Sequence, residues 1–106
     1  MSDTHAQTFV LSLYVTGTSP RSRQAIENLQ RICEQELQGR YRLHIVDVLQ
    51  HPQVAEDHKI LATPTLIKQL PLPLRRVVGD LSDKEKVLFG LEVRRPAEIP
   101  IDPRDK

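Results

Sequence analysis

Cysteine is the residue type in this sequence with the strongest potential for chemistry, and the 106-residue chain contains a single one, Cys33. A reactive cysteine is a thiolate, which is stabilised at the beginning of a helix or beside a cation. Cys33 instead shares the helical spacing of Ile26 and Leu29, so we predict that it is buried and inert. A lone cysteine forms no internal disulfide and fits a reducing cytoplasm.

Metal ligands and acid–base pairs are the next possibility. His51 and His58, with Asp57, flank one predicted short helix, but the histidines are seven residues apart and no cysteine joins them. Solvated histidines near a turn are therefore the favoured interpretation. Asp47 follows a predicted strand, where a carboxylate most often caps the next turn. Because no Ser-His-Asp set or glycine-rich phosphate loop is present, we predict no enzyme, no cofactor and no metal site.

Composition narrows the class of protein further. The 15 basic side chains nearly balance the 14 acidic ones, so a general polyanion-binding surface is not indicated. Two Tyr, two Phe and no Trp argue against a stacking platform for single-stranded nucleic acid. No signal sequence or membrane-length apolar run is present. We predict a cytoplasmic protein with one domain over residues 8–93, a flexible N-terminus (1–7) and a flexible C-terminal tail (94–106).

A β-α-β unit is predicted for the first half of the chain. Apolar residues alternate over residues 8–16 and form one face of a predicted strand. The residues between them are also too apolar to face open water, so we predict a strand that is buried on most of both faces. Ser19 and Pro20 then suit the beginning of a helix, which an apolar stripe extends to about residue 38. A second strand is expected over residues 41–48, with His44 pointing outward on the opposite side from Ile45.

The second half of the chain predicts shorter elements. A short helix is expected over residues 52–61, strands over 64–68 and 75–79, and a stiff proline connection over 70–73. Ser82 and Glu85 have the spacing of a capping box, so a helix should begin at Ser82. Asp80 and Asp83 are better explained by the favourable effect of negative charge near this helix N-terminus than as a paired acid and base. Residues 87–93, however, satisfy both a helical and a strand period, and Gly90 lies in the middle of them.

Pro64, between Thr63 and Thr65, indicates the fold. A Thr-Pro-Thr entry to a strand, after a strand, a helix, a strand and a short helix, is where thioredoxin-like folds place a cis proline. The expected fold class is therefore α/β and thioredoxin-like. Residues 17–22, where the catalytic thiol of such a fold would lie, contain no cysteine, which argues against thiol–disulfide exchange. Glutathione binding without a catalytic thiol remains open.

Four basic residues cluster around the predicted strand after Pro64: Lys59, Lys68, Arg75 and Arg76. They could be scattered surface charge without a function. They could equally form a basic rim around an exposed strand edge that binds an acidic protein partner.

Long segments of the chain resemble the KaiB family of cyanobacterial clock proteins. These segments are LYVTG (13–17), VDVL (46–49), KILATPTL (59–66), LPLP (70–73), RR (75–76) and GDLSD (79–83). The resemblance implies a non-enzymatic protein that binds the hexameric ATPase KaiC and modulates its phosphorylation and ATPase state, with KaiA or a sensor kinase as a further partner. It also implies a metamorphic chain, in which a homo-oligomeric ground state, a dimer or a tetramer with the order βαββααβ, interconverts with a thioredoxin-like monomer.

The resemblance also implies roles for individual residues. Lys59, Lys68, Arg75 and Arg76 would lie in or near the KaiC contact. Pro64, Pro71 and Pro73 would be the peptide bonds that isomerise between folds, and Gly90 would mark the change from helix to strand. An alternative is a stress-response adaptor that acts without a full oscillator, since the proline-broken, slightly basic residues 94–106 differ from the acidic tail of clock KaiB proteins.

Overall fold

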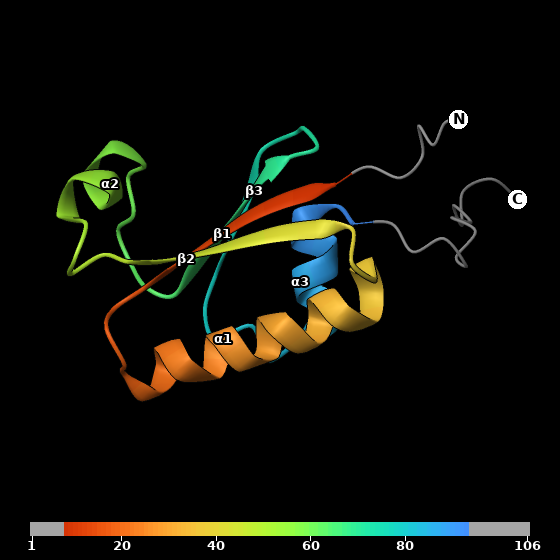
Figure 1. The fold of residues 1–106 in the computed structure, drawn as a ribbon, viewed down its shortest axis with the longest axis horizontal. Coiled ribbons are helices and arrows are strands. Elements are labelled where there is room, and N and C mark those ends of the chain that lie inside the picture. The colour runs from red at the N-terminus through yellow and green to blue at the C-terminus, as the bar shows by residue number, and fades with distance from the viewer. Residues whose placement is uncertain (1–7, 94–106) are drawn as a thin grey trace, which may run out of the picture.

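The computed structural model describes residues 8–93, and the predicted termini, 1–7 and 94–106, lie outside that range. Three α-helices, one π-helical segment and four strands follow one another along these residues (Figure 1). Their bounds are β1 Phe9–Val15, α1 Pro20–Ile32, η1 Cys33–Leu37, β2 Tyr41–Asp47, α2 Pro52–Asp57, β3 Thr65–Leu70, β4 Arg75–Val78 and α3 Lys84–Leu91.

The four strands form one mixed sheet in the order β2-β1-β3-β4. β1 and β2 run parallel, and the crossover between them through α1 confirms the predicted β-α-β unit. β3 is antiparallel to β1, and β4 is antiparallel to β3. This order leaves β2 and β4 at the two edges of the sheet.

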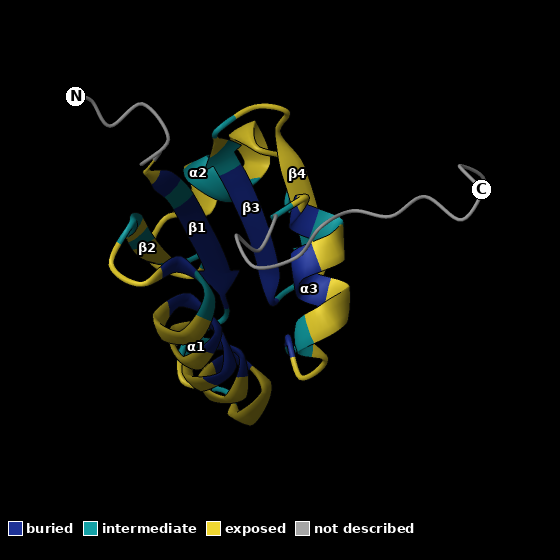
Figure 2. Cartoon of the chain, turned by 90° about the vertical axis from the view of Figure 1, so that its right-hand side faces the viewer, coloured by how far each residue is buried: buried dark blue, intermediate teal, exposed yellow. Residues whose placement is uncertain are grey.

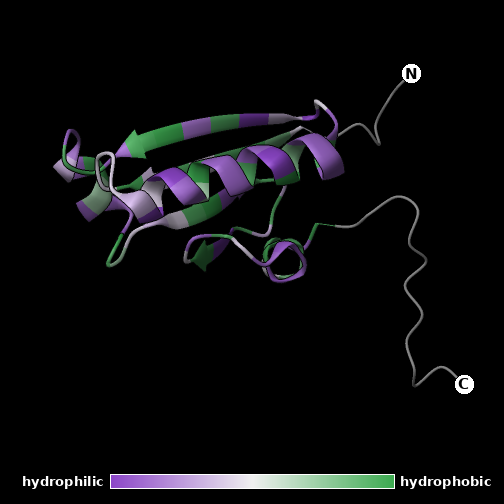
Figure 3. Ribbon diagram, turned by 90° about the horizontal axis from the view of Figure 1, so that it is seen from below, coloured by the Kyte–Doolittle hydropathy of each residue, from purple (hydrophilic) through white to green (hydrophobic). Residues whose placement is uncertain are grey.

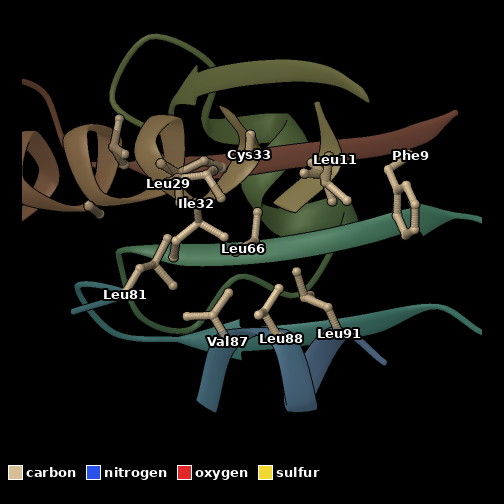
Figure 4. Close-up of a cluster of buried hydrophobic side chains, with 14 residues drawn as sticks. Phe9, Leu11, Leu29, Ile32, Cys33, Leu66, Leu81, Val87, Leu88 and Leu91 are labelled. Carbon is tan, nitrogen blue, oxygen red and sulfur yellow. The ribbon is translucent and has the colours of Figure 1, made fainter. Parts of the chain in front are cut away.

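The hydrophobic core lies between the sheet and the two longer helices. Leu29 from α1, Leu66 from β3 and the α3 residues Val87 and Leu91 converge in it, each 2% exposed or less (Figure 4). Polar residues occupy the outer side of α1 (Figure 3), which is the amphipathic arrangement that its apolar stripe predicts. β1 is buried almost throughout (Figure 2), because α1 and α3 cover one of its faces and the segment around α2 approaches the other.

Caps define both ends of the first helix. The Ser19 hydroxyl accepts a hydrogen bond from the Ser22 backbone N–H at 3.2 Å, and Pro20 is the first helical residue, as predicted. At the other end η1 continues the helix in π geometry to Leu37. Gln38 then takes a left-handed conformation, and Gly39, with φ 84°, completes the turn into β2.

Several predicted boundaries differ in the structure. α2 ends at Asp57 rather than near residue 61, because Lys59 adopts φ 55°, outside the helical region. β3 extends to Leu70. α3 begins at Lys84, because the side chain that accepts the helix-end N–H, from Lys86, belongs to Asp83 and not to Ser82. The peptide bond before Pro64 is cis, as predicted, and so are the bonds before Pro71 and Pro73.

α3 includes residues 87–91 of the segment with two periods, 87–93, so most of that segment is helical. Val87, Leu88 and Leu91 are buried on the side of α3 that faces the core, while Phe89 is 86% exposed. The helix thus buries three of the apolar side chains of this segment and leaves one in solvent. In residues 8–93 no helix is long and apolar enough to cross a membrane.

Candidate docking surface

Side chains at the N-terminus of α1 carry hydroxyl groups, and none of them is a thiol. The Ser22 hydroxyl accepts from the Thr16 backbone N–H at 3.0 Å, and the Ser19 hydroxyl donates to it at 2.9 Å. The Thr63 hydroxyl, beside Pro64, contacts that of Thr16. These groups bond to one another, and no thiol lies at the position where a thioredoxin-like enzyme has its cysteine.

Cys33 lies at the far end of the helix and is fully buried, as predicted. Burial, reinforced by the neighbouring Glu34 carboxylate, raises the pKa of Cys33 to about 12. A thiol with such a pKa is almost entirely protonated near neutral pH, so it has no nucleophilic or metal-binding form available.

His58 and Asp47 make contacts that hold the fold together. The His58 ring lies tilted against that of Tyr14, with an interplanar angle of 39° and ring centroids 6.0 Å apart. Within residues 8–93 no three His, Cys, Asp or Glu side chains gather as a metal site would need. Asp47 caps the turn as expected, and its carboxylate accepts from the N–H groups of Leu49 at 2.9 Å and Gly17 at 3.0 Å.

Exposure along β2 differs from the prediction at one residue. His44 is exposed as expected, but Ile45 on the other face is 43% exposed, because β2 is an edge strand that α1 covers only in part.

Arg76 connects two of the predicted partner-binding segments. Its guanidinium donates to the carbonyl oxygens of His58 at 3.0 Å and Lys59 at 3.2 Å, so the turn after α2 is held against β4. Lys59 and Arg76 are both exposed, and Arg75 is their neighbour along β4. We call Lys59, Arg75 and Arg76 the basic edge.

Lys68 does not belong to this exposed surface, which corrects the prediction that all four basic residues form a rim. Lys68 is 1% exposed, because its side chain lies on the same face of β3 as Leu66, which the helices cover. Arg75 is its direct partner on β4. Burial lowers the pKa of Lys68, the positive charge of Arg75 lowers it as well, and the negative charge of Glu92 partly raises it again.

Glu92 is the acidic residue of this surface, and sequence reasoning did not single it out. Its carboxylate pairs with the Arg75 guanidinium, and both side chains are nearly half exposed. Glu92 follows the last residue of α3 and adopts a left-handed conformation, with φ 59°. A sequence signal existed, since a helix that ends at residue 91 makes Glu92 its cap, but the competing strand period of residues 87–93 obscured it.

Apolar side chains border the basic edge. Val78 on β4 is 60% exposed and Phe89 on α3 is 86% exposed, and the proline connection adds Leu72 at 73%. A shallow hollow of about 770 Å³ runs between β4 and α3. This β4 groove is lined by Arg75, Arg76, Leu88, Phe89, Gly90, Glu92 and Val93. Exposed apolar and cationic groups side by side are typical of a protein-docking surface.

Comparison with known proteins identifies the family. The KaiB domain model matches residues 12–93. The circadian clock oscillator protein KaiB of Synechococcus elongatus is 58% identical over 87 residues, which cover 82% of this chain and 85% of that protein. The chain belongs to the KaiB family.

Other relatives agree with this assignment. KaiB3 of Synechocystis is 58% identical over 84 residues, covering 79% of this chain and 82% of that protein. KaiB of Gloeothece citriformis is 56% identical over 91 residues and 86% of each chain. The KaiB family consists of non-enzymatic clock proteins, so the chain is a homologue of a clock regulator and not an enzyme.

Solved structures confirm that this KaiB-family chain has a thioredoxin-like α/β fold here. The N-terminal domain of Synechococcus elongatus SasA superposes with a TM-score of 0.69 at 24% identity, over 94% of this chain and 96% of that one. Mitochondrial thioredoxin 3 of Saccharomyces cerevisiae gives a TM-score of 0.65 at 14% identity, over 81% and 78% of the two chains. At these identities the likeness concerns the fold alone.

Proposed function

We propose that this chain is a timing regulator that docks on a KaiC-type ATPase through the basic edge and modulates the phosphorylation and ATPase state of that enzyme. One observation carries the proposal: in a KaiB-family chain, Arg76 joins Lys59 to β4, so that cations from two separate segments form one exposed surface. Lys68 is buried beneath this surface, where it is the cross-strand neighbour of Arg75.

The chemistry of this surface favours an acidic protein partner. Lys59, Arg75 and Arg76 are exposed, and within residues 8–93 the Arg75 charge is balanced by the solvated carboxylate of Glu92. A positive patch accelerates the encounter with a negative one and weakens as salt rises. KaiA or a sensor kinase would be a further partner, and the site of action would be the cytoplasm.

The direct experiment mixes the purified protein with the KaiC-type ATPase of its own genome and follows the complex by native mass over hours. Arg75→Glu together with Arg76→Glu is expected to weaken binding at least about tenfold, because charge reversal replaces attraction by repulsion. Arg23→Glu together with Arg42→Glu is the charge-matched control, since Arg42 is exposed on β2 at the opposite edge of the sheet and Arg23 is exposed on α1. Equal loss in both variants would show a nonspecific charge effect.

Absence of any complex would contradict the proposal and favour a stress-response adaptor with a different partner. A complex that leaves KaiC phosphorylation and ATP hydrolysis unchanged would keep the docking and remove the regulatory role.

A second conformation is part of the proposal. In a βαββααβ ground state, residues 87–93 would include a strand, and the exposed position of Phe89 on α3 supports this, because a strand pairs Phe89 with Val87 and Leu91 on one face. The KaiB resemblance assigns Pro64, Pro71, Pro73 and Gly90 to this switch.

Native mass spectrometry and analytical ultracentrifugation test this second conformation. We expect them to show a homotetramer of a second form in slow exchange with a thioredoxin-like monomer. A monomer at every concentration would remove the switch.

A further inference from the structure

The outer edge of β4 has no paired strand among residues 8–93. The Gly79 N–H bonds to the Pro64 carbonyl oxygen at 2.9 Å, and the β3–β4 register continues from there through Thr65 opposite Val78. Backbone groups of an antiparallel strand point to alternate sides, so those of Arg76 and Val78 point away from β3. In the part of the chain that the structure describes, no further strand pairs with this edge. Arg76 and Val78 therefore each present one N–H and one C=O outward.

The β4 groove offers side-chain contacts beside this edge. Gly90 packs closely against Val77, because a Cβ added there would lie 2.8 Å from Val77 Cγ2, so α3 lies directly against the strand. Phe89, 86% exposed, is the most exposed apolar side chain that lines the groove. A strand added to β4 would place alternate side chains toward Phe89, which an extended partner could thereby remove from water.

Charge decides between a partner protein and a second copy of this chain. Two copies that paired through β4 would bring the Arg75 and Arg76 side chains of both into one interface, and like charges there are unfavourable. A segment that carries Asp or Glu instead meets two guanidinium groups. The chain already shows that an acid fits this place, because the Glu92 carboxylate pairs with Arg75 in the groove.

We propose that β4 binds an extended, acidic segment of its protein partner as an added strand, with Glu92 as an internal stand-in that the partner's carboxylate displaces from Arg75. The proposal rests on the proposed function in one respect, since the partner that provides this segment is the KaiC-type ATPase. It adds the mode of binding, which is backbone pairing along Arg76 and Val78 with an apolar contact to the exposed Phe89 side chain.

The test compares Val78→Pro with Val78→Ala in binding to the intact ATPase hexamer. Both variants lose the valine side chain, but only proline loses the outward N–H, and proline is tolerated on an edge strand where the N–H is not used within the sheet. Val78→Pro is expected to bind about tenfold more weakly than Val78→Ala, the effect of one lost hydrogen bond. Phe89→Ser should weaken binding to a similar degree, and circular dichroism confirms that each variant is folded.

Amide hydrogen exchange of the wild-type protein tests the same proposal without a substitution. The N–H groups of Arg76 and Val78 should exchange quickly in the free monomer and become protected in the complex. If wild type binds normally, two results would overturn strand addition while leaving KaiC docking intact. One is equal affinity of the two Val78 variants, and the other is a lack of protection of the Arg76 and Val78 amides in the complex. Failure of wild type to bind at all would instead overturn the proposed function.

Discussion

Lys68 on β3 and Arg75 on β4 are direct cross-strand partners, so two cations lie side by side, one 1% exposed and the other with 47% of its side chain exposed. Like charges directly opposite each other destabilise a sheet. Glu92, at the end of α3, is the acidic side chain that acts on both of them, through its ion pair with Arg75 and its effect on the pKa of Lys68. The end of α3 is thereby tied electrostatically to the edge of the sheet.

Replacement of Lys68 by methionine is expected to stabilise the thioredoxin-like form. Burial lowers the pKa of Lys68, so the unfolded chain binds its proton more tightly and the charged lysine opposes folding. Lys68→Met should raise the free energy of unfolding by about 1 kcal/mol near neutral pH. This gain in stability should shrink as pH rises to the ordinary lysine pKa of about 10.4, where the Lys68 side chain also becomes neutral in the unfolded protein. Urea unfolding at both pH values measures this, and a gain that is independent of pH would contradict it.

The Cys33 thiol should react only in the unfolded chain. An aromatic disulfide reagent is expected to leave the native protein unmodified and to modify it fully in urea, because Cys33 is buried and protonated. The raised pKa has a second effect: the unfolded thiol ionises near its ordinary pKa of about 8.5, while the folded one does so at about 12.

The folded state therefore binds more protons in that interval, and stability decreases as pH rises through it. Cys33→Ala lacks this loss, so its deficit relative to wild type should become smaller from about pH 8.5 upward. Urea unfolding of the two proteins gives the comparison. Parallel stability curves would show that the thiol reaches solvent in the folded state.

Gly90 and Val77 should show strong energetic coupling. Alanine is favoured over glycine in a helix by about 1 kcal/mol, but the added methyl would lie too close to Val77 Cγ2. Gly90→Ala alone is thus expected to change stability by less than about 0.5 kcal/mol, whereas in a Val77→Ala background it should stabilise by about 1 kcal/mol. A double-mutant cycle in urea measures the difference, and simple additivity of the two substitutions would refute the close packing of α3 on β4.

Glu92→Gln should separate stability from binding. Loss of the exposed ion pair with Arg75 is expected to lower the free energy of unfolding by at most about 1 kcal/mol. Affinity for the KaiC-type ATPase should rise several-fold, because Arg75 no longer has to release an internal carboxylate before it binds an external one. Glu85→Gln is a matched control, since Glu85 lies at the other end of α3. An affinity equal to that of wild type would show that the partner does not contact Arg75.

The sequence alone determined the elements whose signals are local. Ser19 and Pro20 define the beginning of α1 through a side-chain acceptor and a fixed φ angle, and the two-residue period of β1 predicts its burial, since these properties depend on neighbours along the chain. Pro64 marks the entry to β3 for the same reason. The family was predictable too, because the motifs that carry the resemblance are long.

Only the tertiary structure decided the state of residues 87–93 and of Lys68. Both periods of that segment are sterically acceptable, and the helix is chosen because the sheet and α1 offer Leu66 and Leu29 as a surface that Val87, Leu88 and Leu91 together can cover. The same helix covers the face of β3 that carries Lys68, which turns an apparent surface cation into a buried one. Periodicity within a strand gives the face of each residue, but packing between distant segments decides which face is removed from water.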